Sequence, residues 1–381
     1  MSDTGQERYV IQNMGDRFDY ISQLPDCILH HILSFIPSKD VLKTSVLSKR
    51  WNNVWTSVSN LDLDDALLYT SVIDCRDPPE ETCFVNFVER VLTLRGGLSI
   101  NRFRLSCRVY FDASRIYSWV SAAVMHNVQE LDLCVFVEDP FVLPRSMFCS
   151  QTLTSLKLEI NCVLEIPDII CFPRLKTLYL SLIIFPDNDS TQRLLTGCRA
   201  LEELVILDCE WILKDLTISS LTLERLTIDD LPYFGPPDSD SGCKIKIYTP
   251  KLLYLNYRGY PLNEIFLCDV SSLVETYISV PVPHAKQKEV ASHVVDLLKG
   301  VRKVVSLTVA DNTIESLVFA DDLLTHLPVF KNLTHLELSV EIGNSTIGPL
   351  MKLLNCCPNL QSLHFAEVDL TSVSFCIKIT M

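Results

Sequence analysis

The sequence lacks the features that mark secreted, membrane and nucleic-acid-binding proteins. Its start, MSDTGQERYV, has no basic stretch followed by an apolar core, so no signal peptide is predicted. No uncharged apolar run reaches 18 residues, which predicts no membrane-spanning helix. Acidic residues outnumber basic ones, with 47 Asp and Glu against 33 Lys and Arg. Nucleic-acid binding usually needs a basic surface. We therefore expect a soluble intracellular protein, in the nucleus or the cytoplasm, that binds neither membranes nor nucleic acid.

Catalytic and metal-binding motifs are also missing. The chain has no G-x-S-x-G, G-x-x-x-x-G-K-[ST], G-x-G-x-x-G or H-E-x-x-H motif. Its 15 cysteines include no C-x-x-C pair, and no Cys/His cluster has zinc-ligand spacing. Cysteines scattered through apolar sequence favour free thiols in a reducing compartment over a disulfide framework. We expect no catalytic residue, no metal and no cofactor.

Acidic residues gather in a few places that we interpret as structural. The pairs Asp64-Asp65, Asp229-Asp230 and Asp321-Asp322 are more simply helix caps or solvated loops than catalytic carboxylates. The acidic, turn-rich sequence GPPDSDSG at 235–242 predicts an exposed loop between two strands.

The most informative segment is 19–55, which holds three short helical patterns. The first begins at Leu24-Pro25-Asp26, because proline suits the first helical turn and Asp26 suits the positive helix N-terminus. Pro37 ends this helix, and Ser38 and Ser48 are the expected N-caps of the next two. The segment has more apolar side chains than so small a unit can bury, which predicts a protein partner.

This segment resembles the F-box of plant F-box proteins. The LPD opening, the HHILSF and PSKDVLKTSVLSKRW runs and the closing tryptophans carry the resemblance. It implies docking to a Skp-type adaptor, which links an F-box protein to a cullin–RING ubiquitin ligase. The adaptor contacts that it implies, the last two at the rim, are Leu24, Pro25, Ile28, Leu29, Ile32, Leu33, Val41, Leu42, Val46, Leu47, Trp51, Trp55, Lys49 and Arg50. The alternative is a small helical cap that closes a larger core.

The rest of the chain repeats an apolar-x-x-apolar-x-apolar pattern about every 26 residues, within the leucine-rich-repeat range. Alternating inward residues predict a short strand, which must stack on its neighbours because one repeat cannot bury its own apolar edge. The eleven motifs begin at Ile100, Val128, Leu153, Leu175, Leu201, Leu223, Leu252, Leu273, Val304, Leu333 and Leu360.

Amphipathic stretches between these motifs predict outer helices, at 84–92, 119–124, 290–300 and 350–354. The predicted fold is α/β: an N-terminal three-helix F-box followed by an irregular leucine-rich-repeat solenoid, a curved parallel sheet with outer helices. Two smaller α/β domains are the alternative. The expected organisation is a disordered N-terminus at 1–15, the F-box at 16–58, a linker at 59–83, the repeats at 84–366 and a tail at 367–381.

The repeat region resembles that of plant F-box/FBD proteins, most clearly in LTSLKL, FPRLKTLYL and LLTGCRALEELVILDC. In that family an FBD segment usually follows the last repeat. Here the sequence ends about twenty residues after CPNLQSL, so we expect the FBD segment to be missing. A truncated isoform or a degenerate gene copy is one interpretation of that ending.

Target binding is expected on the concave side of the sheet, where residues between and after the last two apolar positions of each motif point outward. These residues are Arg104, Asp132, Lys157, Glu159, Tyr179, Asp229, Asn256, Arg258, Tyr277, Glu337 and His364. Tyrosine and arginine are favoured at interfaces, so Tyr179, Asn256, Arg258 and Tyr277 are the predicted target contacts. Plant hormone receptors share this architecture, but their inositol polyphosphate needs a denser basic cluster than Arg104, Lys157 and Arg258 provide.

Three hypotheses follow. The first is a substrate-recognition subunit of a Skp–cullin–F-box ubiquitin ligase that binds an unknown target protein, while partner enzymes transfer ubiquitin. The second is a protein that binds the adaptor without recruiting a productive substrate. The third is an enzyme on an α/β scaffold, which the missing motifs disfavour.

Overall fold

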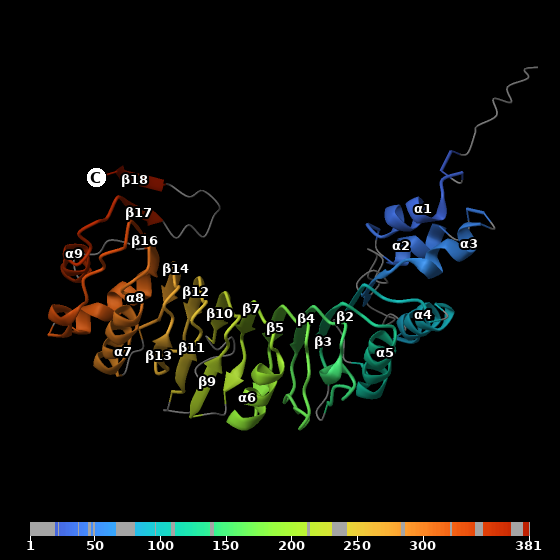
Figure 1. The fold of residues 1–381 in the computed structure, drawn as a ribbon, viewed down its shortest axis with the longest axis horizontal. Helices are drawn as coiled ribbons and strands as arrows, with labels where there is room; N and C mark the ends of the chain where they lie inside the picture. Colours follow the sequence, from blue (N-terminus) through green and yellow to red (C-terminus); the bar gives the residue numbers. More distant parts are fainter. Residues whose placement is uncertain are drawn as a thin grey trace, which may run out of the picture. The chain divides into compact units, whose positions relative to one another are not determined.

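The computed structural model shows two compact units, Met1–Ser59 and Asn60–Met381 (Figure 1). Segment 1–15, Asp321 and residues 235–241 of the predicted loop lie outside the part of the chain that it describes. The described residues are 20, 21, 23–36, 38–44, 47, 48, 50–65, 81–95, 97–107, 111–137, 141–211, 214–230, 242–282, 286–320, 322–339, 346–366 and 376–380.

The N-terminal unit contains the three predicted helices, α1 (Asp26–Leu33), α2 (Ser38–Lys43) and α3 (Trp51–Val54), and α3 continues into the 3₁₀ turn Trp55–Ser57. Pro25 is the N-cap of α1, and Asp26 lies in its first turn. The Trp51 N–H donates to Ser48 Oγ at 3.5 Å, as the predicted cap requires. The core of this unit consists of Leu29, Leu33, Val41, Trp51, Val54, Trp55 and Val58.

The second unit is built on a 13-stranded sheet, which is parallel except for its last pair. All eleven predicted motif strands are confirmed, and they follow one another across the sheet in sequence order. They are β2 (Arg102–Cys107), β3 (Glu130–Val135), β4 (Ser155–Ile160), β5 (Thr177–Ser181), β7 (Glu203–Leu207), β10 (Arg225–Asp229), β12 (Tyr254–Arg258), β14 (Glu275–Ser279), β15 (Ser306–Ala310), β16 (His335–Ser339) and β17 (Ser362–Ala366).

Two further strands belong to this sheet, one at each edge. β1 (Asn60–Asp64) pairs in parallel with β2, and β18 (Cys376–Thr380) pairs antiparallel with β17. The predicted linker at 59–83 and the predicted tail at 367–381 therefore each contain a strand. In β1 the buried residues Leu61 and Leu63 alternate with partly exposed ones, which is the same period-two pattern as in the repeats.

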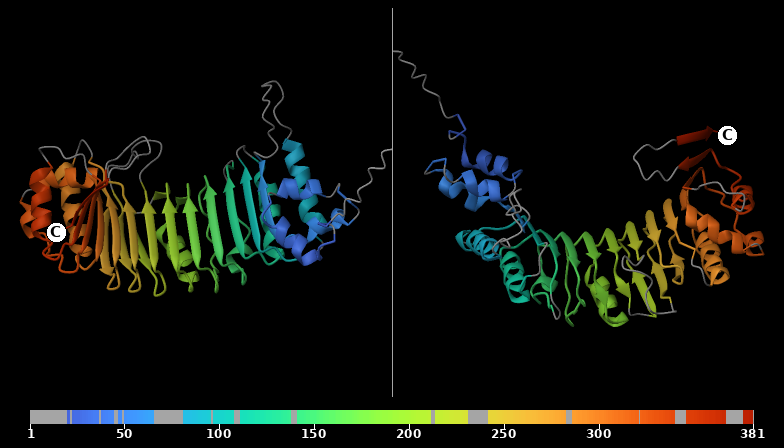
Figure 2. Two further views of the ribbon diagram at one scale, coloured as in Figure 1. Left: turned by 90° about the horizontal axis from the view of Figure 1, so that it is seen from above. Right: turned by 180° about the vertical axis from the view of Figure 1, so that it is seen from behind.

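The sheet is curved, and its convex side carries the outer layer (Figures 1 and 2). The predicted helices at 84–92, 119–124, 290–300 and 350–354 are confirmed within four of the outer helices. The helices of this unit are α4 (Glu81–Leu94), α5 (Ala113–Met125), α6 (Asn188–Gly197), α7 (Gln287–Gly300), α8 (Asp311–Ser316) and α9 (Ile347–Asn355). Short 3₁₀ turns lie at Met147–Cys149, Leu317–Ala320 and Leu323–His326.

A second sheet lies in the middle repeats, where the sequence predicted no outer helix. Its three parallel strands are β9 (Asp215–Ser219), β11 (Lys244–Tyr248) and β13 (Glu264–Asp269), with β11 in the centre. Leu216 and Ile218 in β9, and Ile245 and Ile247 in β11, are buried and alternate with polar residues. This alternation favours a strand over a helix. Two short strands, β6 (Ile184–Phe185) and β8 (Glu210–Trp211), form a further pair.

Candidate functional site

Helix α1 of the N-terminal unit has two apolar sides, of which the unit buries only one. Leu29 and Leu33 lie in its core, where α1 packs against α3 and the following turn. Ile28 and Ile32 are 43% and 40% exposed, and Phe35, just after the helix, is 76% exposed. The spacing of these three residues places them along one side of the helix. We call Ile28, Ile32 and Phe35 the α1 stripe.

The structure divides the predicted adaptor contacts into two groups. Buried members, which form the core of the unit, are Leu29, Leu33, Val41, Trp51 and Trp55. Accessible members are Leu24, which is half-buried, and the exposed residues Pro25, Ile28, Ile32, Leu47 and Arg50. The side chain of Leu42, and Val46 and Lys49, lie outside the described residues. Adaptor contact by any of these residues stays a prediction.

Exposed apolar residues that the sequence reasoning missed are Tyr20, Ile21 and Phe35. Phe35 could have been found, because it continues the spacing of Ile28 and Ile32 by one helical turn. Tyr20 and Ile21 precede the first helix, and no periodic signal marks them.

Arg50 connects the start of α3 to the start of α1. Its Nη2 lies 2.5 Å from Asp26 Oδ1 and donates to the Leu24 carbonyl oxygen, also at 2.5 Å. The hydrogen bond from Arg50 is the largest cause of the lowered pKa of Asp26. Arg50 was predicted at the adaptor rim, and its contacts show that it also fixes the chain where α1 begins.

On the second unit, the strand register aligns the predicted concave residues in two rows. One row runs through Arg104, Asp132, Lys157, Tyr179, Asn256, Tyr277, Glu337 and His364. The second row, two residues further along each strand, contains Glu159, Asp229 and Arg258. The residues between the two rows are buried leucines, isoleucines and similar side chains, so both rows lie on the face opposite the core.

Charges at the N-terminal end of this face are paired with one another. Arg104 Nη1 lies 2.8 Å from Asp62 Oδ1 and 3.4 Å from Asp64 Oδ2, and its Nε lies 3.8 Å from Asp132 Oδ2. Burial lowers the pKa of Arg104, but the hydrogen bond and attraction from these carboxylates outweigh it and raise the pKa. Lys157 Nζ lies 3.6 Å from Glu159 Oε2 and 4.8 Å from the centre of the Tyr179 ring.

The four predicted target contacts do not form one cluster. Asn256 and Tyr277 are register partners on the adjacent strands β12 and β14. Arg258 lies beside them, and its Nη1 is 3.1 Å from Asp229 Oδ2. Tyr179 is on β5, which β7 and β10 separate from β12, a distance of about 14 Å at normal strand spacing.

Two acidic residues that we expected in caps or solvated loops are buried instead. Asp65 is 1% exposed and Asp230 is 6% exposed. The Asp230 carboxylate accepts hydrogen bonds from the Tyr260 N–H at 2.6 Å and from the side-chain amide of Asn263. Burial raises the pKa of Asp230 to about 7, although these hydrogen bonds oppose the shift. The prediction was therefore wrong for Asp230, and burial excludes a solvated loop for Asp65.

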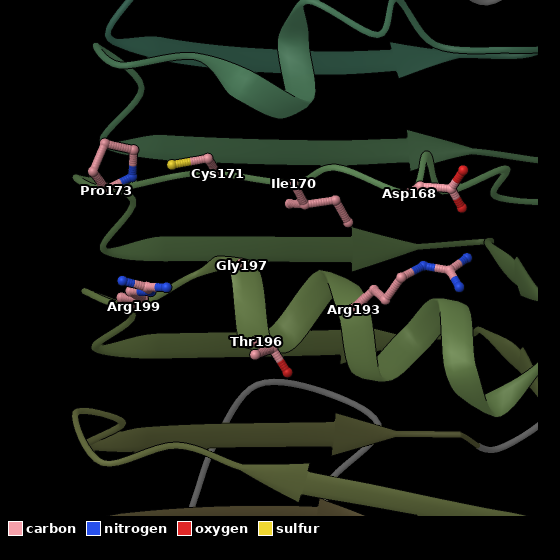
Figure 3. Close-up of a pocket in the computed structure, with 8 residues that line it drawn as sticks. All are labelled: Asp168, Ile170, Cys171, Pro173, Arg193, Thr196, Gly197 and Arg199. Atoms are coloured by element: carbon pink, nitrogen blue, oxygen red, sulfur yellow. The ribbon is translucent and has the colours of Figure 1, made fainter.

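A pocket of about 350 Å³ lies where α6 meets the loop after β4 (Figure 3). A side chain at Gly197 would clash with Ile170, and the Phe172 N–H donates to the Gly197 carbonyl oxygen at 3.0 Å, so the loop packs closely on the helix. Arg193 and Arg199 lie at opposite ends of the pocket in Figure 3, so their guanidinium groups do not converge on one ligand. The lining residues are Asp168, Ile170, Cys171, Pro173, Arg193, Thr196, Gly197 and Arg199.

Buried thiols in the repeat unit are poor nucleophiles. Burial raises the pKa of Cys198, Cys209, Cys243 and Cys357 each to about 12, so these thiols stay protonated near neutral pH. Among the residues that the structure describes, no three His, Cys, Asp or Glu side chains are grouped as metal ligands. Within the same ranges, no helix is both long and apolar enough to cross a membrane.

The fold is that of a leucine-rich-repeat protein with a small helical unit at its N-terminal end, and that unit carries an exposed apolar stripe. Comparison with known sequences shows which family of leucine-rich-repeat proteins this is. An F-box domain profile matches residues 21–63, and the profile "FBD-associated F-box protein At5g56370, LRR repeats" matches residues 116–232.

Similar proteins of Arabidopsis thaliana extend the match to most of the chain. F-box/LRR-repeat protein At4g14096 is 34% identical over 91% of this chain and 73% of its own length. Putative F-box/FBD/LRR-repeat protein At3g59240 is 32% identical over 94% and 71%, and F-box/LRR-repeat protein At4g14103 is 32% identical over 91% of each chain. The chain belongs to the F-box/LRR-repeat protein family of plants.

Proposed function

We propose that this chain is the substrate-recognition subunit of a Skp–cullin–F-box ubiquitin ligase, acting in the nucleus or the cytoplasm. Its F-box binds a Skp-type adaptor, and its repeats bind a target protein. The observation that carries the proposal is the α1 stripe, because Leu29 and Leu33 fill the core of the unit and leave Ile28, Ile32 and Phe35 exposed. An apolar stripe on the segment that matches the F-box profile supports the adaptor as its partner.

The chain itself then performs no covalent step. Its contribution is to hold the target near a ubiquitin-loaded partner enzyme, which raises the effective concentration of the two reactants. The protonated buried thiols are consistent with this division of work. The Arg50 contacts to Asp26 and Leu24 fix the start of α1 and so help to orient the stripe.

The test is adaptor binding by the full chain, measured by isothermal titration calorimetry with a purified Skp-type adaptor. Ile28 and Ile32 are already more than half buried in the free unit, so docking removes only their exposed parts from water, which stabilises the complex by about 1 kcal/mol each. An aspartate at these positions adds the cost of burying a charge, so the double variant Ile28→Asp/Ile32→Asp should weaken binding at least 100-fold. Ile169→Asp, at an exposed isoleucine of the repeat unit, is the matched control and should bind as the wild type does.

Circular dichroism of the double variant shows whether the helical unit remains folded. A wild-type chain that does not bind the adaptor, or a folded double variant that binds equally well, would overturn the proposal. Leu24→Ala/Pro25→Ala is a milder change at the start of the F-box, and we expect it to weaken binding as well.

One observation favours the alternative, an adaptor-binding protein that recruits no productive substrate. Arg104 and Lys157 on the concave face are paired within the chain, so they offer little free charge to a target. Proximity labelling followed by half-life measurements distinguishes the two functions. Faster turnover of a captured protein when the chain is expressed supports the ligase role, and unchanged turnover of all captured proteins supports the alternative.

A further inference from the structure

A row of residues that the motif pattern did not single out lies just before the strands of the large sheet, at their N-terminal ends. They are the second residues of the repeat motifs, linked by backbone hydrogen bonds. The Val274 N–H donates to the Leu253 carbonyl oxygen at 3.0 Å, and the Val305 N–H donates to the Val274 carbonyl oxygen at 2.8 Å. The earlier members of the row are polar or charged: Asn101, Gln129, Thr154, Lys176, Glu202 and Glu224.

The row becomes apolar at three successive repeats and then polar again. Leu253, Val274 and Val305 are 44%, 44% and 38% exposed, and Thr334 and Gln361 follow them. Because these repeats contribute the adjacent strands β12, β14 and β15, the three side chains span about 10 Å. We call Leu253, Val274 and Val305 the aliphatic strip.

Polar groups beside the strip, on the concave face, have hydrogen-bonding capacity to spare. Glu275 and Glu337 are exposed and make no ion pair with any residue in the described ranges. Asn256 Oδ1 is buried and has no hydrogen-bond partner among them. The Tyr254 ring, next to the strip, holds the Arg225 guanidinium carbon 4.4 Å from its centre. Lys251 and Lys303 are exposed and precede Leu253 and Val305 by two residues in the sequence.

We propose that the aliphatic strip, together with Glu275 and Glu337, is the surface on which the target protein docks. Its occupant is an extended segment of the target that lays aliphatic side chains on the strip and Lys or Arg side chains near Glu275 on β14 and Glu337 on β16. Three or four extended residues span the strip. Charge complementarity selects a basic residue on the concave side, where the carboxylates lie. This proposal rests on the proposed function, and it specifies the chemistry of the segment that is recognised.

Recognition at the aliphatic strip works through side chains rather than through a strand added to the sheet. The backbone groups that join the row are already hydrogen-bonded to the neighbouring repeats. The segment therefore crosses the repeats and contacts one side chain from each.

The probe for the test is a phage-displayed library of random 12-residue peptides, selected on the full chain. We expect the selected peptides to combine aliphatic residues with Lys or Arg. Their affinity, measured by fluorescence polarisation, should fall at least tenfold in Leu253→Asp/Val274→Asp/Val305→Asp. In Glu275→Gln/Glu337→Gln it should fall three- to tenfold for peptides with Lys or Arg. Ile169→Asp and Lys251→Gln/Lys303→Gln are the controls and should bind the peptides unchanged.

Several results would overturn the proposal. They are a selection that yields no binding peptides, peptides without Lys or Arg enrichment, and full affinity in the folded triple variant. A wild-type dimer, seen by light scattering and dissolved by the triple variant, would also overturn it, because a second copy would then occupy the strip. Adaptor binding by the same variants separates the two proposals. If the wild-type chain binds the peptides but not the adaptor, the ligase role is rejected and the docking surface is supported.

Discussion

The two ends of the concave face share one backbone geometry but differ in how far their charged side chains are ion-paired within the chain. At β1–β4, Arg104 lies among three carboxylates and Lys157 lies beside Glu159. At β12–β16, Arg258 is paired with Asp229 of β10, but Glu275 and Glu337 have no cationic partner within the described ranges, and aliphatic side chains lie at the starts of the strands. A regular repeat therefore does not by itself make a binding face; the pairing of its charged side chains also matters. Paired charges stabilise one end, and unpaired ones leave the other end available to a partner.

The largest expected effect concerns the core beneath the two ends. Phe103 in β2 and Thr276 in β14 occupy the same register position and are both buried. Phe103→Ala would leave a cavity under the charge-paired end and lower the free energy of unfolding by about 3–5 kcal/mol. Urea unfolding followed by circular dichroism measures it. A loss below about 1 kcal/mol would mean that the neighbouring strands collapse into the space.

A second prediction concerns a carboxyl that is neither paired with a cation nor exposed. The pKa of Asp230 is about 7 in the folded chain and close to 3.8 when unfolded. Its protonated form stabilises the fold fully below pH 4, and that contribution is lost as the pH rises to about 7, up to about 4 kcal/mol in total. Asp230→Asn should remove this part of the pH dependence. Parallel stability curves for the two proteins between pH 4 and 8 would contradict it.

A third prediction weakens the charge-paired end itself. Arg104→Ala leaves Asp62, Asp64 and Asp132 without their shared cation, and we expect the free energy of unfolding to fall by about 1–2 kcal/mol. The loss should be smaller in 1 M salt than in 0.05 M salt, because salt screens the remaining carboxylates. Lys176→Ala, which breaks the exposed ion pair with Glu202, is the control and should leave the unfolding midpoint unchanged. Equal midpoints for both variants would show that the Arg104 cluster contributes nothing.

The smallest expected effect is a gain in stability at the C-terminal end. Thr276 Oγ1 is buried and has no hydrogen-bond partner among the described residues. Thr276→Val keeps the shape and removes the unsatisfied hydroxyl, so the free energy of unfolding should rise by about 1 kcal/mol. Thermal unfolding of the two proteins measures it, and a lower melting temperature for the variant would show that the hydroxyl finds a partner.

Most of the large sheet could be predicted from the sequence, because each motif strand pairs with its sequence neighbour and repeats the same buried positions. The outer sheet could not. Leu216 and Ile218, like Ile245 and Ile247, form one short alternation per repeat, too short to distinguish from a loop. The strand β1 could have been predicted, because Val58, Leu61 and Leu63 complete the same apolar-x-x-apolar-x-apolar motif and are all buried.

The candidate site was harder to predict than the fold. Ile28 and Leu29 are sequence neighbours with similar side chains, and only the packing of α1 on α3 decides that Leu29 is buried and Ile28 is exposed. The aliphatic strip was missed for a related reason. Leu253 directly follows the motif residue Leu252, so composition alone cannot separate the exposed leucine from the buried one.

Asn263 has a consequence for the engineering of this chain. Its side chain donates to the Asp230 carboxylate and accepts a hydrogen bond from the Cys243 N–H at 2.6 Å, so one amide joins the two flanks of residues 231–242. These contacts hold the two ends of the segment together. Because the entropic cost of closing a loop rises only slowly with its length, a longer segment should destabilise the fold little. A fluorescent reporter inserted between Asp238 and Ser239 would leave both chain ends untagged.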